Sequence, residues 1–428
     1  MFGRTVYSLD EVYGISRDVP LNYIERESVD GAFRKNLRRG KHITIFGSSK
    51  QGKTCLRKHC LNISEYIVVQ CSNKWTLSDL NAHILKQAGY ELTESKKTSM
   101  NGKAKLIASI KSKFLPVDAG IESSLETGEG SETVYRQLEL DIDDANDVIS
   151  ALKEINFSKY IVLEDFHYLK QEVQKDFSIE LKAFHENSSL CFIIVGVWLD
   201  ENKLVIYNGD LTGRTVSVNA DAWEKHELAQ VIANGASLLN IEFDRNFVAS
   251  LLEECNGNVY MVQEACYRVC EKENVTETLR EFKEIGAGCD AKTIVKNIVK
   301  EQSGRYNAFI TNYATGFQET ALEMHRWILY PILTADTDTL MQGLTYRSIR
   351  MLLESVHPKK GELNPGNVTQ ALKSVVSLQL SKSIQPIILD YDESNLKLHV
   401  VDRGFVIWLK AQDKAEILKL AGLPIDQE

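Results

Sequence analysis

The stretch HITIFGSSKQGKTCLRKHC, residues 42–60, decides the fold that we expect for this chain. Its first five residues are mostly apolar or β-branched and predict a buried strand, and Thr54 to Leu61 predict the start of a helix. The loop between them fits the pattern G-x-x-x-x-G-K-[ST] at every fixed position. Its residues are Gly47, Ser48, Ser49, Lys50, Gln51, Gly52, Lys53 and Thr54.

A strand, this loop and a helix in succession form a phosphate-binding arrangement. Inward-facing amides and the helix N-terminus attract an anion. Gly52 allows the backbone to approach a phosphate, Lys53 neutralises the β- and γ-phosphates, and Thr54 supplies a hydroxyl ligand to Mg²⁺. We count Cys55, the next residue, among the nucleotide-binding positions. The alternative is a glycine-rich turn that matches by chance. The sequence thus predicts a site for ATP and Mg²⁺.

A second motif, KYIVLEDFHYL at residues 159–169, supplies carboxylates to this site. Residues 160–163 form an uninterrupted apolar run, as expected of a central parallel strand. Glu164 and Asp165 follow at its C-terminal end, where ligands of open α/β sheets bind. One acid would hold Mg²⁺ and the other would orient the attacking water. We expect Glu164 at the metal and Asp165 as a short catalytic base, with the reverse assignment left open. A solvated acidic strand end is the alternative.

These two motifs resemble those of AAA+ and STAND P-loop ATPases, and most closely those of origin-recognition-type ATPases. The resemblance spans about residues 15 to 410 and implies an ATPase core followed by a helical lid. It places Asn22 and Tyr23 over the adenine and makes Arg214 a candidate arginine finger that reaches a neighbouring subunit. A surface arginine is the alternative for Arg214. The two residues that sense phosphate in relatives are not evident, which suggests slow hydrolysis.

The composition agrees with a soluble globular protein of more than one domain. The chain has 428 residues, 43% of them hydrophobic and 25% charged, and a formal net charge of −9. It contains no long apolar run and no signal peptide, so we expect no membrane contact and a cytoplasmic location. The eight scattered cysteines predict free thiols. The net negative charge disfavours a wholly basic nucleic-acid binder.

The order of predicted elements gives an α/β fold with a parallel sheet. The expected strands are residues 42–46, 66–70, 160–163, 191–197 and 215–218, with helices between them. We assign residues 1–220 to the ATPase core, with an insertion at about 92–139 that forms a partly ordered protrusion and could contain a hairpin around Ile121 and Leu125. Residues 221–320 form a helical lid and connector.

Residues 321–428 show three helical patterns followed by two strands, the order of a winged helix. Such a domain places its third helix in the DNA major groove. Residues 345–400 would supply the contacts, among them Arg347, Arg350, Asn367, Thr369, Gln370, Lys373 and Lys397. From His325 to Gln412, ten Lys and Arg stand against eight Asp and Glu, a net charge of +2. This is weak for a DNA binder, so a protein-docking domain is the alternative.

We therefore expect an ATP-binding switch with slow hydrolysis that self-associates and engages a protein partner. Proteins of this appearance in bacteria include regulators of defence against phage. One alternative is a DNA-directed initiator, loader or transposition-type ATPase. Another is a scaffold that holds nucleotide permanently. A small-molecule kinase fits poorly, because the lid and the C-terminal domain would have no role in it.

Overall fold

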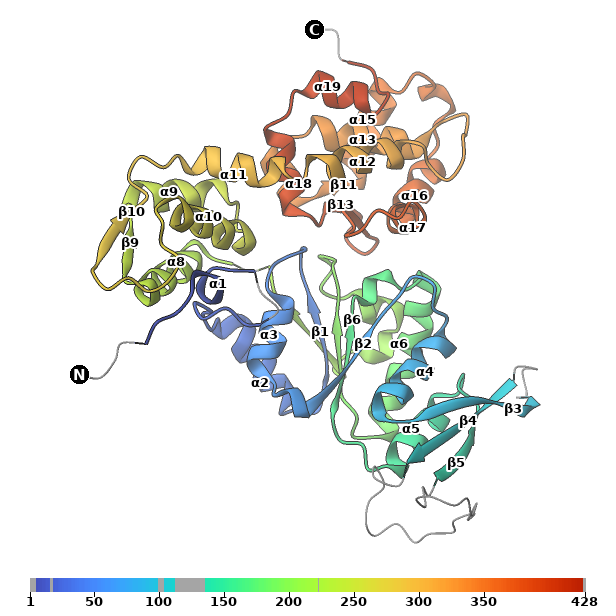
Figure 1. Ribbon diagram of the computed structural model, residues 1–428. Coiled ribbons are helices and arrows are strands. Elements are labelled where there is room, and N and C mark those ends of the chain that lie inside the picture. The colour runs from blue at the N-terminus through green and yellow to red at the C-terminus, as the bar shows by residue number, and fades with distance from the viewer. Residues whose placement is uncertain (1–4, 16–17, 99–103, 112–134, 222, 426–428) are drawn as a thin grey trace.

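The computed structural model describes residues 5–15, 18–98, 104–111, 135–221 and 223–425 (Figure 1). Its centre is a five-stranded parallel sheet in the order β2-β6-β7-β1-β8. The strands are β1 (His42–Phe46), β2 (Tyr66–Gln70), β6 (Tyr160–Glu164), β7 (Phe192–Val195) and β8 (Thr215–Asn219). All five predicted strands are present and pair in parallel, which confirms the α/β fold class.

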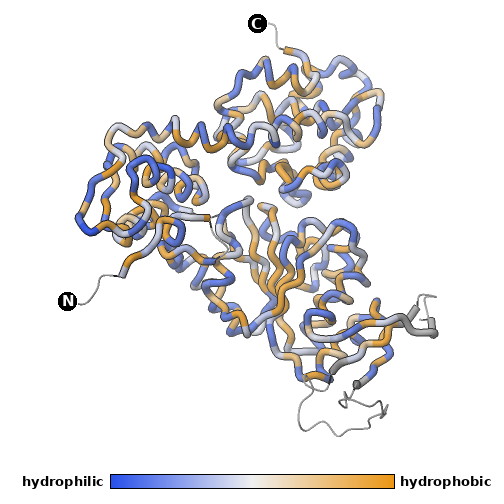
Figure 2. The backbone as a smooth tube through the Cα atoms, in the orientation of Figure 1, coloured by the Kyte–Doolittle hydropathy of each residue, from blue (hydrophilic) through white to orange (hydrophobic). Residues whose placement is uncertain are grey.

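Helices cover both faces of this sheet (Figure 1). Figure 2 shows that the central strands are more hydrophobic than the helices around them. They are α2 (Ala32–Leu37), α3 (Lys53–Cys60), α4 (Leu77–Ala88), α5 (Ala145–Glu154), α6 (Gln171–Asn187) and the short α7 (Lys203–Tyr207). Strand residues alternate between two cores. Ile161 and Leu163 pack with α4, α5 and α6, whereas Val162 packs with α2 and α3. The sheet is therefore buried on both faces, and the C-terminal ends of its strands remain accessible to ligands.

The insertion contains more regular structure than the sequence predicted. Strands β3 (Glu91–Thr98), β4 (Ala104–Lys111) and β5 (Tyr135–Leu140) form a separate antiparallel sheet. Ala108 is buried, and Leu92, Leu106 and Leu138 pack against the same apolar cluster as α4 and α5. The hairpin expected around Ile121 and Leu125 lies outside the described residues.

A helical region follows the core sheet. It comprises α8 (Lys225–Leu239), β9 (Ile241–Phe243), α9 (Arg245–Glu254), α10 (Val259–Lys272), β10 (Lys283–Ile285), α11 (Ala291–Lys300) and α12 (Ser303–Ala314). The short helix α1 (Leu9–Val12) from the N-terminus packs against α8. We call residues 225–285 the lid. All eight cysteines are free thiols, and five of them are buried, as predicted.

The C-terminal region, residues 324–420, combines helices with a small sheet. Its elements are α13 (Met324–Thr334), α14 (Thr337–Gln342), β11 (Leu344–Thr345), α15 (Tyr346–Val356), α16 (Pro365–Lys373), α17 (Val375–Ser381), β12 (Leu389–Asp392), β13 (Lys397–Val400), α18 (Arg403–Lys410) and α19 (Lys414–Leu420). The strands pair in the order β11-β13-β12. The predicted third helix is divided at Ser374, whose side chain bonds to the carbonyls of Gln370 and Ala371. The winged-helix assignment remains a prediction.

No helix in the described part of the chain is both long and apolar enough to cross a bilayer. The lid and the C-terminal region share one continuous apolar cluster, which also includes α11 and α12. The core sheet has its own two clusters. In Figure 1, the C-terminal end of the sheet faces the lid and the C-terminal region. The phosphate-binding motif lies at this end of the sheet.

Candidate nucleotide site

The phosphate loop connects β1 to α3 and takes the backbone path that its glycines permit. Gly47 has φ +141° and Gly52 has φ +84°, conformations that side chains with a Cβ rarely adopt. A Cβ at Gly47 would lie 3.0 Å from the backbone nitrogen of Asp221. Lys50 also has a positive φ of 62°. Helix α3 begins at Lys53, so its N-terminal amides face the loop.

Lys53 is buried and points back into the loop. Its Nζ donates to the carbonyl oxygens of Gly47, at 2.9 Å, and Ser48, at 2.5 Å. Burial lowers the pKa of Lys53 to about 8, and the nearby carboxylates of Asp221, Glu164 and Asp165 oppose this effect. The ammonium group therefore donates its hydrogen bonds to main-chain carbonyls. A phosphate, which is a stronger acceptor, can replace these carbonyls.

A cavity of about 590 Å³ opens beside the loop, between the core and the lid. This volume is in the range of small-molecule sites. Its lining includes Ser49–Cys55 from the loop, Glu164 and Asp165 from the end of β6, and Val231, Val259, Tyr260 and Gln263 from the lid. Asn22 and Tyr23 line it as well. The structure thus brings nearly all the residues predicted to bind nucleotide to one cavity. Their roles in nucleotide binding remain predictions.

Glu164 and Asp165 differ in their surroundings, although they are neighbours. Glu164 is buried and accepts a 3.0 Å hydrogen bond from Nε of Arg57. Asp165 has φ +56° and accepts a hydrogen bond from the side-chain amide of Gln70 at the end of β2. Burial raises the pKa of both carboxyls, and this effect is opposed by Arg57 at Glu164 and by Lys53 at Asp165. Each acid is thus held by one partner of its own.

The donor set fits Mg²⁺. The Thr54 hydroxyl and the two carboxylates are hard oxygen donors that line one cavity. Among the described residues, no cluster of three or more His, Cys, Asp or Glu could hold a metal by itself. Mg²⁺ in nucleotide sites is usually bound by one or two carboxylates together with phosphates. The ion would therefore arrive with the nucleotide, and Thr54 and Glu164 would hold it.

The N-terminal segment reaches the cavity in a way that the sequence only partly indicated. The Asn22 side chain is buried and exchanges hydrogen bonds with Gln263 of the lid. The Tyr23 hydroxyl bonds to Asp30, 2.6 Å away. Arg26, which we did not predict, lines the cavity with its guanidinium 3.8 Å from the ring centroid of Trp223. Asn22 thus ties this segment to the lid.

The two places where the resemblance would put phosphate sensors are the end of β7 and the start of α10. At the end of β7, Trp198 is fully buried, and a Cβ on Gly196 would collide with its ring. At the lid, Tyr260 instead lies under Lys50, whose Nζ is 3.9 Å from the ring centroid. The lid therefore contacts the phosphate loop through a cation–π interaction.

Arg214 lies away from this cavity. It precedes β8, and its carbonyl accepts from the backbone N–H of His42 at the start of β1, whereas the phosphate loop follows the end of β1. Its guanidinium pairs with Glu186 at 2.6 Å. Within one chain it cannot touch the nucleotide, and its role toward a second subunit stays a prediction.

The C-terminal region contacts the phosphate loop directly, a contact that no sequence motif indicates. The backbone N–H of Ser49 donates to the carbonyl of Val401 at 3.0 Å. Asp221 receives the backbone N–H of Ser48 at 2.9 Å and its hydroxyl at 2.6 Å. Arg403 then bonds both to Asp221, at 3.3 Å, and to the lid carbonyl of Asn256, at 2.8 Å. Core, lid and C-terminal region therefore meet at one arginine.

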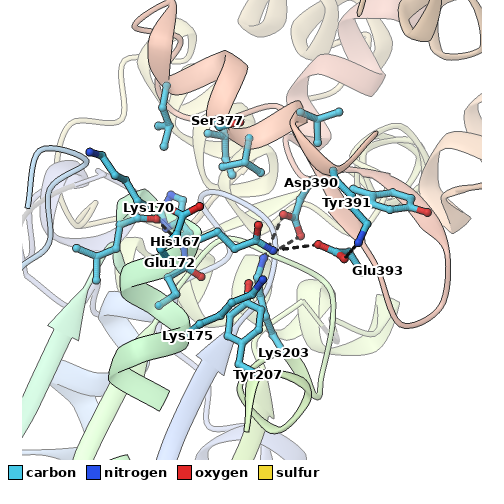
Figure 3. Close-up of a pocket in the computed structure, with 18 of the residues that line it drawn as sticks. His167, Lys170, Glu172, Lys175, Lys203, Tyr207, Ser377, Asp390, Tyr391 and Glu393 are labelled. Atoms are coloured by element: carbon cyan, nitrogen blue, oxygen red, sulfur yellow. Dashed lines mark hydrogen bonds and ion pairs between the residues drawn. The ribbon is translucent and has the colours of Figure 1, made fainter. Parts of the chain in front are cut away.

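A second set of contacts holds the C-terminal region on the core. Lys203 of α7 pairs with Asp390 of β12 at 3.2 Å. Glu393 accepts from Gln171 of α6 at 2.9 Å and pairs with Lys373 at 2.5 Å. Figure 3 shows Lys203, Asp390 and Glu393 beside a cavity of about 590 Å³ between the two parts. We call this set the seam.

No family model and no curated protein matches the chain. Solved structures do. A Walker-type ATPase of Pyrococcus abyssi is 13% identical, with coverage of 93% of this chain and 99% of that one and a TM-score of 0.49. The ORC1 protein of Aeropyrum pernix in complex with DNA is 11% identical, with coverage of 97% and 98% and a TM-score of 0.43.

The RuvB Holliday junction branch migration motor of Thermotoga maritima is 12% identical, with coverage of 94% and 96% and a TM-score of 0.35. Likenesses at such identities concern the fold, and the function of this chain has to come from its own residues. The candidate nucleotide site therefore rests on the two motifs of this chain, at residues 47–54 and 159–169.

Proposed function

We propose that the protein is an ATP-binding switch in which nucleotide occupancy controls how firmly the C-terminal region is docked. The observation that carries this proposal is that one peptide unit, between Ser48 and Ser49, forms a hydrogen bond on each side. The carbonyl of Ser48 accepts from Nζ of Lys53, and the N–H of the same peptide, which belongs to Ser49, donates to Val401. One peptide therefore links the phosphate-binding lysine to the C-terminal region.

The two hydrogen bonds of this peptide reinforce each other. A cation on the carbonyl polarises the peptide and makes its N–H a stronger donor. A triphosphate competes for Lys53 and draws the ammonium group away from the carbonyls of Gly47 and Ser48. The N–H of Ser49 then binds Val401 less strongly. ATP would therefore loosen the docking of the C-terminal region, and the empty site would favour the docked form.

Hydrolysis would follow, but slowly. Mg²⁺ neutralises charge on the triphosphate. Asp165 would orient the attacking water from its place beside Gln70, and Glu164 would hold the metal. The short side chain of Asp165 and the apolar residues at both sensing positions support a low rate. A slow rate suits a switch, because the bound state then lasts long enough for a partner to engage.

The partner and the setting follow from the resemblance alone. Self-association through Arg214, engagement of a protein and a role in defence against phage remain predictions. For DNA, the C-terminal region offers an exposed Arg347 and Gln370, but Lys373 pairs with Glu393 and Arg350 pairs with Glu354. Two of the proposed cations are thus already neutralised, which supports a protein-docking surface over a DNA-binding one.

Titration calorimetry with ATP and Mg²⁺ tests the nucleotide site. The wild-type chain should bind ATP, and Lys53→Ala should lose binding while keeping its circular dichroism spectrum. Arg38→Ala, on the exposed end of α2, is the matched control and should bind like the wild type. Equal affinity of wild type and Lys53→Ala would refute the phosphate-loop assignment, whereas unfolding of Lys53→Ala would favour a permanent nucleotide scaffold.

A further inference from the structure

Arg57 is a buried cation at a place where the nucleotide site needs none. It lies one helical turn after Lys53 on α3 and is 4% exposed. Its Nε bonds to Oε1 of Glu164 at 3.0 Å, and its guanidinium carbon is 4.6 Å from the ring centroid of Tyr66. Its Nη1 is buried without a hydrogen-bond partner among the described residues. Such a buried, incompletely satisfied guanidinium is costly and calls for an explanation.

Its only carboxylate contact among the described residues is the acid proposed to hold Mg²⁺. Burial raises the pKa of Glu164, and Arg57 acts against this rise. In the nucleotide-free protein, Arg57 thus supplies the positive charge that a buried carboxylate requires. When Mg²⁺ binds together with the triphosphate, the carboxylate of Glu164 would have to ligate the metal as well as pair with Arg57.

We propose that Arg57 is a positioning residue that stands in for the metal and competes with Mg²⁺ for Glu164. This proposal rests on the proposed function. Arg57 holds the carboxylate in the empty site and weakens the binding of Mg²⁺ to the nucleotide complex. Free Mg²⁺ alone therefore does not fill the site, and the metal enters only when the triphosphate adds its own oxygens.

Calorimetry tests the competition. ATP is titrated into the protein with excess Mg²⁺ and with a chelator, and the ratio of the two affinities measures how strongly the metal contributes. Arg57→Met keeps the length and apolar stem of the side chain and removes the charge. It should raise this ratio about 10-fold, the effect expected from one charge-assisted hydrogen bond. A ratio that is unchanged or lower overturns the proposal.

Two further variants separate this effect from a structural one. Arg57→Gln is neutral but keeps a hydrogen-bond donor, so it should raise the ratio in the same direction even if Arg57→Met does not fold. In a Glu164→Gln background, the effect of Arg57→Met should vanish, because the pair no longer exists. An effect of the same size in that background contradicts competition for Glu164.

Lys58→Met provides the matched control. It removes a cation from the next position of α3, which does not line the nucleotide cavity. Its affinity ratio should equal that of the wild type. If the wild-type protein binds no ATP at all, the proposed function fails; if it binds ATP and the Arg57 variants do not change the ratio, only the role of Arg57 fails.

Discussion

The backbone N–H of Ser49 in the phosphate loop donates a 3.0 Å hydrogen bond to the carbonyl of Val401, more than 300 residues away in the sequence. The loop that would hold a triphosphate therefore also holds the C-terminal region. Ser48 and Lys50, on either side, contact Asp221 and Tyr260. Three consecutive residues of the loop thus touch three different segments, so a change in the loop reaches all of them.

Removal of Arg403 should release the C-terminal region. Arg403→Met breaks the bonds to Asp221 and to the lid carbonyls of Asn256 and Gly257. Bonds to a charged group contribute about 1.5–3 kcal/mol each, so we expect a Tm several degrees lower and faster trypsin cleavage after Lys397 and Lys410, the sites that the variant keeps in this segment. Arg347→Met, on an exposed position of the same region, should change neither. Unchanged cleavage of Arg403→Met would show that the seam and the Ser49–Val401 bond hold the region without Arg403.

Substitutions of Asp165 and Glu164 should affect different properties, namely turnover and Mg²⁺-dependent ATP binding. Asp165→Asn should keep ATP binding and lower turnover about 100-fold or more, because an amide cannot act as a base. Glu164→Gln should instead weaken the Mg²⁺-dependent part of ATP binding. Phosphate release and calorimetry measure the two properties. If Glu164→Gln alone stops turnover with normal metal dependence, the two roles are reversed.

Arg214 should matter only between subunits. Arg214→Ala should lower turnover by up to about 10³-fold at protein concentrations where the chain self-associates, and leave the residual rate of the monomer unchanged. Glu186→Gln breaks the same ion pair but retains the arginine, so it controls for loss of local structure. A loss that is equal at all protein concentrations would rule out a finger in trans.

The affinity for ATP should fall at alkaline pH. Burial lowers the pKa of Lys53 to about 8 in the nucleotide-free protein, and the charged form binds phosphate. Near pH 7 the group is already protonated, so Lys53 contributes little pH dependence there. Above pH 8 binding requires uptake of a proton, and the affinity falls by up to about tenfold per pH unit.

Lys53→Arg is the control for this pH dependence. Its guanidinium stays charged throughout this range, so its affinity, although lower, should not fall between pH 8 and 9.5. Calorimetry without Mg²⁺ measures both proteins. A wild-type affinity that does not vary with pH would contradict the role of the Lys53 charge.

The core and the motifs could be predicted because their signals are local. The apolar runs of β1 and β6 each end in residues that can bind phosphate or metal, and Thr345 and Asn364 cap the helices that follow them. The sequence also shows that Trp198 and Tyr260, which stand where relatives carry phosphate-sensing residues, are uncharged. Such patterns are read within a few residues, where periodicity and capping act.

The contacts that define the proposed switch could not be predicted in this way. Arg403 and Asp221 are 182 positions apart, and neither lies in a motif. Val401 contributes only a backbone carbonyl, which leaves no trace in the sequence. Arg57 belongs to a helix that was expected, but its pairing with Glu164 depends on how α3 lies on the end of β6. Tertiary packing alone brings these groups together.

Hydrogen–deuterium exchange with and without ATP and Mg²⁺ tests the central claim most directly. The measurement follows peptides that cover residues 47–54 and 397–410 in the same sample. ATP should slow exchange in the phosphate loop, because its amides then bind the phosphates. It should speed exchange in the C-terminal peptides, because the C-terminal region is less firmly docked once the Ser49 bond to Val401 weakens. Slower exchange in both segments, or no change in the C-terminal peptides when the loop is protected, would contradict a nucleotide-controlled release.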